Sequence, residues 1–272
     1  MGKTYVITGA TSGIGKALTE YFAKEHTVFV GYRNKEKLAD LPQNVIPFYI
    51  NATDENSINE AITFIKSKTE KIDTLINVAG CVVAGAMEYV ETDELRRQFE
   101  VNVFSHIKFT QGLLDLLENG KIFNISSMAS FGIFPFVAPY CASKRTLDIL
   151  FNCMQVEFKR NIKIISIKPG VIATPLWEKS INENKAGFSN CKNYDTELNF
   201  MIKNAKDNEI KGLPVNKVVE KIAKIDTQKK PKASYTIGID AKFAQFASHL
   251  PQEILNKLIK FKLAQKAKSL NM

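Results

Sequence analysis

Short apolar runs rich in β-branched residues alternate along this chain with longer amphipathic stretches. The runs are bounded by turn residues and predict strands at 3–8, 27–30, 45–50, 75–78, 121–126 and 162–167. Helical spacing of the apolar residues predicts helices at 14–23, 35–41, 54–68, 93–118 and 140–160. Strands that alternate with helices in this way predict an α/β fold built on a parallel, doubly wound sheet.

The alternation stops at residues 175–214, which are polar and rich in Asn and Lys. The scattered apolar anchors of this segment are Leu176, Trp177, Phe188, Phe200 and Met201. Ligands of open α/β sheets bind beyond the carboxyl ends of the strands. An insertion after the sixth strand is therefore expected to cover a ligand as a lid. The alternative is a surface excursion without a role.

The 272 residues suit one α/β domain, because no linker composition and no internal repeat divides them. We expect a main domain at 1–240, including the 175–214 lid, and a basic helical extension at 241–272. The helix of this extension has apolar residues at helical spacing, namely Ile254, Leu255, Leu258, Ile259 and Leu263. It could pack on its own domain or on a partner subunit, or it could lie on anionic lipid through 251–268.

Charge is concentrated near the C-terminus, although the net charge of the whole chain is +9. Residues 221–272 hold eleven lysines against three acidic residues. No interleaved aromatic and basic groove accompanies them, so nucleic-acid binding is not expected. No apolar run approaches the ~20 residues of a membrane span, and no signal-peptide pattern is present. We expect a cytoplasmic protein, peripheral to a membrane if the basic helix lies on lipid.

Neither the cysteines nor the histidines indicate a metal site. The four cysteines show no metal-ligand spacing and no disulfide framework, and the three histidines lack partners at ligand spacing. We therefore predict reduced thiols and no bound metal.

The first chemical signal is the glycine-rich turn between the first strand and the first helix. It reads Gly-x-x-x-Gly-x-Gly, and its expected cofactor contacts are Gly9, Thr11, Ser12, Gly13, Ile14 and Gly15. Glycines let the backbone approach a pyrophosphate, and the helix that comes next offers free N–H groups. The turn therefore predicts a dinucleotide site, although glycines near a chain start also mark plain turns.

The turn after the second strand bears on which dinucleotide is bound. A carboxylate placed there holds the ribose hydroxyls of NAD and repels a 2′-phosphate. Residues 31–34 include no acid, and Arg33 suits a phosphate. We therefore expect NADP(H) to be favoured over NAD(H). The alternative is that Arg33 is only a solvated residue at a helix start.

A third signal is Tyr140, followed four residues later by Lys144 on a predicted helix. Residues at this spacing share a helix face, so the ammonium is expected near the phenol and should lower its pKa. A tyrosine shifted in this way exchanges a proton with a carbonyl or alcohol oxygen. Ser127, at the end of the fifth strand, is placed to hydrogen-bond the same oxygen. Adjacent Ser126 is the alternative, and the spacing favours Ser127.

Over most of its length the chain resembles a single-domain short-chain dehydrogenase/reductase. The matching motifs are residues 8–15, the Asn77-Val78-Ala79-Gly80 turn, Asn102, Ser127, Tyr140, Lys144 and residues 169–174. The resemblance implies a Rossmann-type, NADP-binding catalytic domain and a catalytic tetrad of Asn102, Ser127, Tyr140 and Lys144, with Tyr140 and Lys144 also touching the cofactor. Asn102 would hold a water molecule in a proton relay that ends at Lys144.

The same resemblance implies further cofactor contacts. The backbone of Ile172 and the side chain of Thr174, which follow Pro169 and Gly170, would hold the nicotinamide carboxamide and the phosphates. Asn77, Ala79 and Gly80 would line the adenosine side. The chain departs from the family pattern at Asn51, where an adenine-binding Asp is usual, and at Val78, where a second Asn is usual.

The resemblance implies the interconversion of a ketone or aldehyde with an alcohol by hydride transfer. The C-terminal residues 231–242 resemble members grouped with steroid and retinol dehydrogenases, and a homodimer or homotetramer is implied. Apolar residues near the motifs favour an apolar substrate, namely Phe131, Ile133, Phe134, Phe136, Val137 and Trp177. The alternative functions are an idle NADP-binding sensor or scaffold and an epimerase or dehydratase of the longer sister family.

Overall fold

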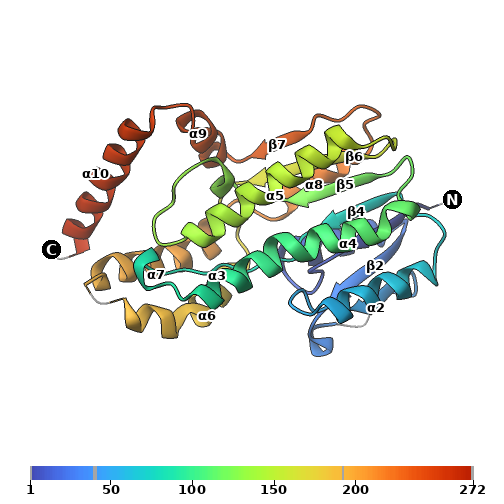
Figure 1. The fold of residues 1–272 in the computed structure, drawn as a ribbon, viewed down its shortest axis with the longest axis horizontal. Helices are drawn as coiled ribbons and strands as arrows, with labels where there is room; N and C mark the ends of the chain where they lie inside the picture. The colour runs from blue at the N-terminus through green and yellow to red at the C-terminus, as the bar shows by residue number, and fades with distance from the viewer. Residues whose placement is uncertain (1, 39–41, 192, 271–272) are drawn as a thin grey trace.

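A parallel sheet forms the centre of the molecule, in a computed structural model that describes residues 2–38, 42–191 and 193–270. Among these residues its seven strands lie in the order β3-β2-β1-β4-β5-β6-β7 (Figure 1). Their bounds are β1 Thr4–Ile7, β2 Thr27–Tyr32, β3 Val45–Tyr49, β4 Thr74–Asn77, β5 Lys121–Ile125, β6 Lys163–Pro169 and β7 Ser234–Ile237. The order reverses beside β1, so the predicted doubly wound α/β fold is confirmed.

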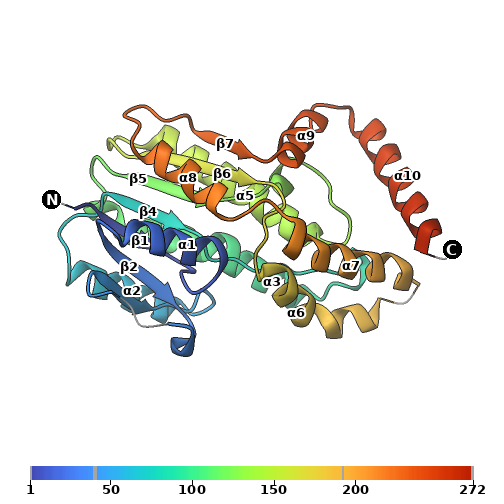
Figure 2. The ribbon, with the colours of Figure 1, turned by 180° about the vertical axis from the view of Figure 1, so that it is seen from behind.

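Helices cover both faces of the sheet, as Figures 1 and 2 show from opposite sides. Helices α1 (Gly13–Phe22) and α8 (Asn216–Asp226) bury Leu18 and Ile222 on one face. Helices α2 (Glu55–Lys66), α4 (Ser105–Leu113) and α5 (Ala138–Glu157) bury Ile65, Phe109 and Phe151 on the other. Each face therefore has its own apolar core, as a sheet wound on both sides requires.

The expected helix at 93–118 is interrupted. Helix α3 (Thr92–Phe99) passes into a π-helical segment (Glu100–Phe104), then into α4, and ends in a 3-10 turn at Leu114–Leu116. A π turn inserts one residue and rotates the rest of the helix about its axis, which apolar spacing does not reveal. At 35–41 only a 3-10 turn (Lys35–Lys37) forms, and 39–41 lie outside the described residues.

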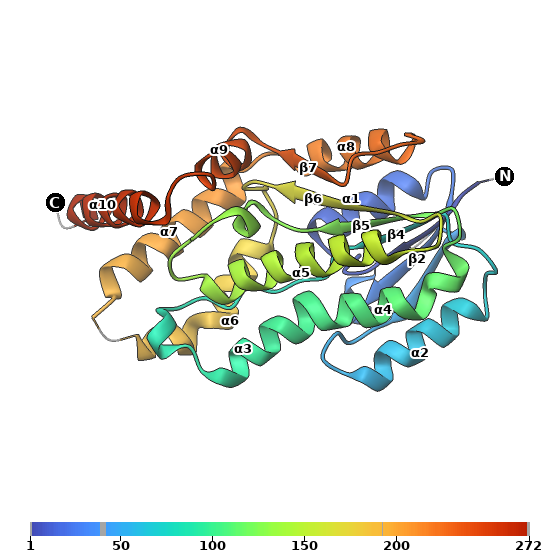
Figure 3. The ribbon, with the colours of Figure 1, turned by 45° about the horizontal axis from the view of Figure 1, so that its top comes forward.

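The segment at 175–214 consists mainly of two helices, α6 (Leu176–Asn190) and α7 (Asp195–Lys211), for which the sequence analysis predicted no structure. They lie beyond the carboxyl ends of the strands (Figure 3). The chain then forms α8 and β7, and ends in α9 (Ile239–Ala247) and α10 (Gln252–Leu270). None of the described helices is both long and apolar enough to cross a membrane.

A buried carboxylate joins several elements at the amino ends of the strands. Asp226 of α8 is 3% exposed and accepts hydrogen bonds from Lys3 Nζ at 2.5 Å and from Tyr5 Oη and Thr74 Oγ1 at 2.8 Å each. Burial alone would raise the pKa of Asp226, but these hydrogen bonds hold it below its ordinary value. The carboxylate is therefore ionised at neutral pH and links α8 to β1 and β4.

Candidate active site

A cavity of about 1160 Å³ lies at the carboxyl ends of the strands. Its wall is formed by the loops after β1, β2, β3, β4, β5 and β6 and by residues of α5, α6 and α7. Parallel strands bring the loops that follow them to one edge, so motifs far apart in the sequence meet here. Most of the predicted site residues share this wall.

The glycine turn forms a narrow cradle at one end of the cavity. Gly9 (φ +62°) and Gly13 (φ +50°) have left-handed backbones, which glycine adopts without steric cost. A Cβ on Gly9 would come within 2.8 Å of Ala79 Cα, and a Cβ on Gly13 within 3.3 Å of Thr174 Cγ2. Thr11, Ser12 and Ile14 also line the wall at the start of α1. The close backbone and the helix N-terminus fit a pyrophosphate.

Gly15 has a different place from the other glycines of the turn. It is not part of the cavity wall, and a Cβ on it would stand 2.2 Å from Gly9 O. Its lack of a side chain lets α1 pack against the turn. Gly15 therefore shapes the cradle from behind.

Arg33 and Asn51 line the same end of the cavity, after β2 and β3. The wall residues beside Arg33 are Gly31, Tyr32 and Asn34, so no carboxylate opposes a phosphate there. Asn51 Oδ1 accepts hydrogen bonds from Thr53 N at 3.3 Å and Thr53 Oγ1 at 3.0 Å. The amide oxygen of Asn51 is thus already engaged within its own loop.

Of the predicted turn after β4, Ala79 and Gly80 lie on the wall and Asn77 does not. Asn77 is 1% exposed, and its amide donates to Thr110 Oγ1 at 3.1 Å and to Asn124 Oδ1 at 2.8 Å. Asn77 therefore joins β4 to α4 and β5. His106, which the sequence analysis left without a site role, is buried on the wall with Nε2 2.8 Å from Ala79 O.

Pro169, Gly170, Ile172 and Thr174 follow β6 and line the wall opposite the glycine turn. Gly170 lies against Asp240 of α9, whose carboxylate accepts from Val171 N at 2.7 Å. The loop is therefore held from behind by α9, with Thr174 facing the Gly13 cradle. Thr174 thus borders the glycine turn, and its hydroxyl fits a contact with a phosphate held there.

Ser127, Tyr140 and Lys144 meet on the wall between the two loops. Tyr140 and Lys144 stand one turn apart on α5, with Lys144 Nζ 5.8 Å from the centroid of the Tyr140 ring. Ser127 follows β5 and hydrogen-bonds Tyr140. Lys144 is 4% exposed, and its ammonium donates to Ile125 O at 2.8 Å.

The expected lowering of the Tyr140 pKa by Lys144 is wrong for this structure. Burial raises the pKa of Tyr140 to about 12, and the hydrogen bond with Ser127 opposes that rise only in part. Burial also lowers the pKa of Lys144 to about 8, opposed by the carboxylate of Asp148. The Lys144 ammonium is directed to Ile125 O, which explains why desolvation dominates at the phenol. Tyr140 is consequently protonated at neutral pH.

Asp148 stands one further turn along α5 and is itself in a buried ion pair. Its Oδ2 lies 2.8 Å from Lys168 Nζ, and its Oδ1 accepts from Ser166 Oγ at 3.0 Å. Lys168 Nζ also lies 4.6 Å from the centroid of the Phe131 ring. The carboxylate of Asp148 in this pair lies one helical turn beyond Lys144. The Tyr-x-x-x-Lys spacing gave no indication of it, because Asp148 lies outside the motif.

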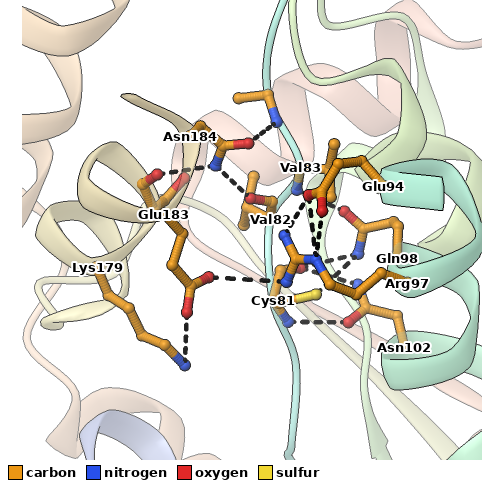
Figure 4. Close-up of polar contacts among 12 residues, drawn as sticks. Cys81, Val82, Val83, Glu94, Arg97, Gln98, Asn102, Lys179, Glu183 and Asn184 are labelled. Carbon is orange, nitrogen blue, oxygen red and sulfur yellow. Dashed lines mark hydrogen bonds and ion pairs between the residues drawn. The ribbon is translucent and has the colours of Figure 1, made fainter. Parts of the chain in front are cut away.

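Asn102 lies in the π-helical segment and is not part of the cavity wall. Its Oδ1 accepts from Cys81 N at 2.9 Å, and its Nδ2 donates to Cys81 O at 3.1 Å (Figure 4). The same Nδ2 donates to Ser143 Oγ at 3.1 Å. Both polar atoms of the Asn102 amide are therefore hydrogen-bonded within the protein. In this structure Asn102 joins the loop after β4 to α5, next to Lys144.

The loop at 81–84 is held from two sides by amide side chains, as Figure 4 shows. On one side, Gln98 of α3 accepts from Val83 N at 2.7 Å and donates to Cys81 O at 2.9 Å. On the other side, Asn184 of α6 accepts from Ala84 N at 2.8 Å and donates to Val82 O at 2.7 Å. Helix α6 is thus fixed to the loop that comes after β4.

An ion-pair chain reinforces this connection. Arg97 of α3 pairs with Glu94 at 2.7 Å and with Glu183 of α6 at 4.0 Å, and Glu183 pairs with Lys179 at 3.7 Å (Figure 4). Arg97, Lys179 and Glu183 line the cavity. The polar edge of the cavity therefore lies between α3 and α6.

Another part of the wall is apolar. Of the apolar residues predicted near the motifs, Phe134, Phe136, Val137 and Trp177 line the cavity, whereas Phe131 and Ile133 do not. Segment 175–214 and helix α10 add further apolar side chains, namely Leu176, Phe188, Phe200, Met201 and Leu263. Segment 175–214 therefore contributes to the cavity.

Comparison with known proteins agrees with this geometry. Residues 3–185 match a family model described as short chain dehydrogenase. The chain is 33% identical to an NADPH-dependent 3-dehydrocapnine reductase of Ornithobacterium rhinotracheale, over 93% of this chain and 94% of that protein. It is 26% identical to a 3-ketodihydrosphingosine reductase of Bacteroides thetaiotaomicron, over 92% and 94% of the two chains.

A solved structure supports the fold independently. A short-chain dehydrogenase from Streptomyces avermitilis superposes with a TM-score of 0.77 at 24% identity, covering 98% of both chains. The family model covers more than half of this sequence, and the motifs that it spans lie on one cavity wall. The chain belongs to the short-chain dehydrogenase/reductase family.

Proposed function

We propose that the protein reduces a ketone on an apolar substrate to an alcohol with NADPH. The observation that carries this proposal is the meeting of Ser127, Tyr140 and Lys144 on the wall that also includes the glycine cradle. Arg33, with no acid beside it, supports NADPH over NADH. The NADPH-dependent relative at 33% identity supports the same choice.

The residues of the cavity wall fit the cofactor and assign the proton transfer. The Gly9–Gly13 cradle, Arg33 and Thr174 would hold NADPH, which would supply the hydride. Tyr140, with a pKa of about 12, holds its proton at neutral pH and donates it to the carbonyl oxygen. Ser127 hydrogen-bonds the same oxygen and orients it. Lys144 is charged below about pH 8, and its ammonium on the same wall would contact the bound cofactor.

The apolar part of the cavity supports a long apolar substrate. It runs from Phe134 to Leu263 of α10, beyond the residues that would hold the cofactor. The two relatives are named for reductions at a 3-dehydro and a 3-keto position. We propose a ketone on a long aliphatic chain as the substrate class. The likeness of residues 231–242 to steroid and retinol dehydrogenases stays a prediction.

A ketone panel tests this proposal. NADPH consumption is measured with 3-ketodihydrosphingosine, a steroid ketone and a short aliphatic ketone. We expect kcat/KM for the long-chain ketone to exceed that for the short one by at least about tenfold, since each buried CH2 is worth ~0.8 kcal/mol. A preference for the short or the steroid ketone would refute the substrate class. NADPH binding without turnover of any ketone would favour the idle sensor.

The variant Tyr140→Phe tests the catalytic assignment separately. It should cut turnover by about 10²–10⁴-fold, the usual range for losing a general acid. NADPH affinity, measured by fluorescence titration, should change little, because the phenol oxygen alone is removed. Near-normal turnover would remove Tyr140 as the proton donor.

A further inference from the structure

The C-terminal arm, which we define as residues 239–265 of α9 and α10, exposes large apolar side chains. It lies at the end of the molecule opposite the N-terminus, beside α7 (Figures 1–3). The reductase reaction uses none of these exposed residues. Monomeric soluble proteins rarely expose contiguous apolar patches of this kind unless something binds there.

One apolar stripe runs along α9. Ile239, Phe243 and Phe246 follow one another at spacings of four and three residues, so they lie on one face of α9, and Leu250 follows shortly after the helix ends at Ala247. They are between 36% and 88% exposed. The opposite face of α9 packs on the domain through Ala241. The stripe is therefore an outward face of a docked helix.

A second stripe lies on α10, which has two apolar faces. Its half-buried face turns toward the domain and includes Leu263, which lines the active-site cavity. Its outer face bears Ile254, Leu258 and Phe261, which are between 48% and 62% exposed. At 3.6 residues per turn, Lys257 and Lys262 fall on either side of this outer stripe.

A cation–π contact connects the two stripes. Lys262 Nζ of α10 lies 5.7 Å from the centroid of the Phe243 ring of α9. The stem of such a lysine lies along apolar surface while its ammonium reaches a polar layer. The arm thus presents aromatic and aliphatic side chains bordered by cations, which is the pattern of helices that lie in a lipid interface.

The charge of the arm indicates which kind of partner it binds. Its residues 239–265 hold four lysines against two acidic residues, and Asp240 is engaged with Val171 N. A second copy of the chain docked on this face by two-fold symmetry would bring the lysines of the two copies close together, where they repel one another. An anionic bilayer neutralises the lysines and buries the apolar stripes together. We propose that the C-terminal arm docks the protein on an anionic lipid surface through these two outer stripes.

Vesicle co-sedimentation tests this surface with the full chain and no cofactor or ketone. Vesicles of phosphatidylcholine alone are compared with vesicles that also contain phosphatidylglycerol. We expect wild-type binding at least about tenfold stronger to the anionic vesicles, weakened by added salt. The double variant Phe243→Ser/Phe246→Ser should lose at least about tenfold of that binding.

Two further variants separate charge from fold. Lys257→Gln/Lys262→Gln should weaken binding to anionic vesicles and leave binding to neutral vesicles unchanged. Tyr21→Ser removes an exposed aromatic of α1, 44% exposed and outside the arm, and should bind like wild type. A circular-dichroism spectrum and a melting temperature like those of wild type check that each variant is folded.

Three outcomes would overturn the proposal. Wild-type protein that stays in the supernatant with both vesicle types would do so, as would unchanged binding of the Phe243/Phe246 variant. A third is a dimer, seen by sedimentation velocity, that the same variant dissociates while vesicles have no effect, since this would assign the arm to a second copy. Because no substrate is present, lipid docking can fail or succeed whatever becomes of the proposed reaction.

Discussion

Replacing Asp148 by Asn should lower the pKa of Lys144 below its value of about 8. Asp148 follows Lys144 by one turn of α5 and is 4% exposed, and its carboxylate opposes the effect of burial on the Lys144 ammonium. Asn keeps the shape of the side chain and removes its charge. The substitution also leaves the ammonium of Lys168 without its partner at 2.8 Å.

The size of the shift is set by the helix geometry. Side chains four residues apart have Cβ atoms ~5–6 Å apart. Two unit charges at ~6 Å interact with about 3 kcal/mol at an effective dielectric constant of ~20. Since ~1.4 kcal/mol corresponds to one pKa unit, this is an upper bound of about two units. Lys168 takes up part of the carboxylate's field, so we expect about one unit.

The pH dependence of kcat/KM for NADPH measures this shift, because it reports ionisations of the free enzyme. In wild type the reductive rate should fall as pH rises through about 8, where Lys144 loses its proton. The Asp148→Asn variant should show the same fall about one unit lower. Ser166→Ala is the matched control, because it removes the hydrogen bond of 3.0 Å to Asp148 without changing charge. An unchanged midpoint in Asp148→Asn would refute the reasoning.

Three further variants test other parts of the structure. Arg33→Ser should weaken NADPH binding by about tenfold and leave NADH binding unchanged in fluorescence titrations; equal losses would contradict the phosphate assignment. Asn184→Ala should lower the free energy of unfolding by about 1–3 kcal/mol in urea, because the backbone of Val82 and Ala84 loses its partners. Asp226→Asn should cost about 3 kcal/mol at neutral pH. The lowered pKa of Asp226 gives wild type stability above the unfolded pKa that is lost as pH falls through the folded pKa, so the difference should vanish in acid.

The sheet was predictable because buried parallel strands are almost continuous apolar runs. The exceptions have identifiable causes. Strand β7 (Ser234–Ile237) is a short edge strand whose only buried residue is Ile237, so it lacks such a run. Helix α8 has a readable signal in Val218, Val219, Ile222 and Ile225, but the lysines between these residues make the segment resemble a solvated charged stretch.

Much of the candidate site was predictable from motifs, and its electrostatics were not. Spacing placed Tyr140 and Lys144 on one helix face, and the structure brings Ser127 to them. The direction of the Tyr140 pKa shift depends on burial by the loops and helices around it, and spacing says nothing of that burial. The charge of Asp148 acts through the same three-dimensional setting.

The contacts of the 81–84 loop show what sequence reasoning cannot reach. Asn184 lies 100 residues from its partner Ala84, and a lone Asn in a polar segment looks like any solvated residue. Yet Asn184, on the lid, and Asn102, beside α5, hold opposite ends of one four-residue loop. Asn102 also donates to Ser143 of α5, the residue before Lys144. Hydrogen bonds at both ends of the loop therefore connect α6 to α5. We therefore expect a substrate that contacts α6 to affect the backbone next to Lys144 through this loop. The Asn184→Ala variant should raise KM for the ketone more than it lowers kcat.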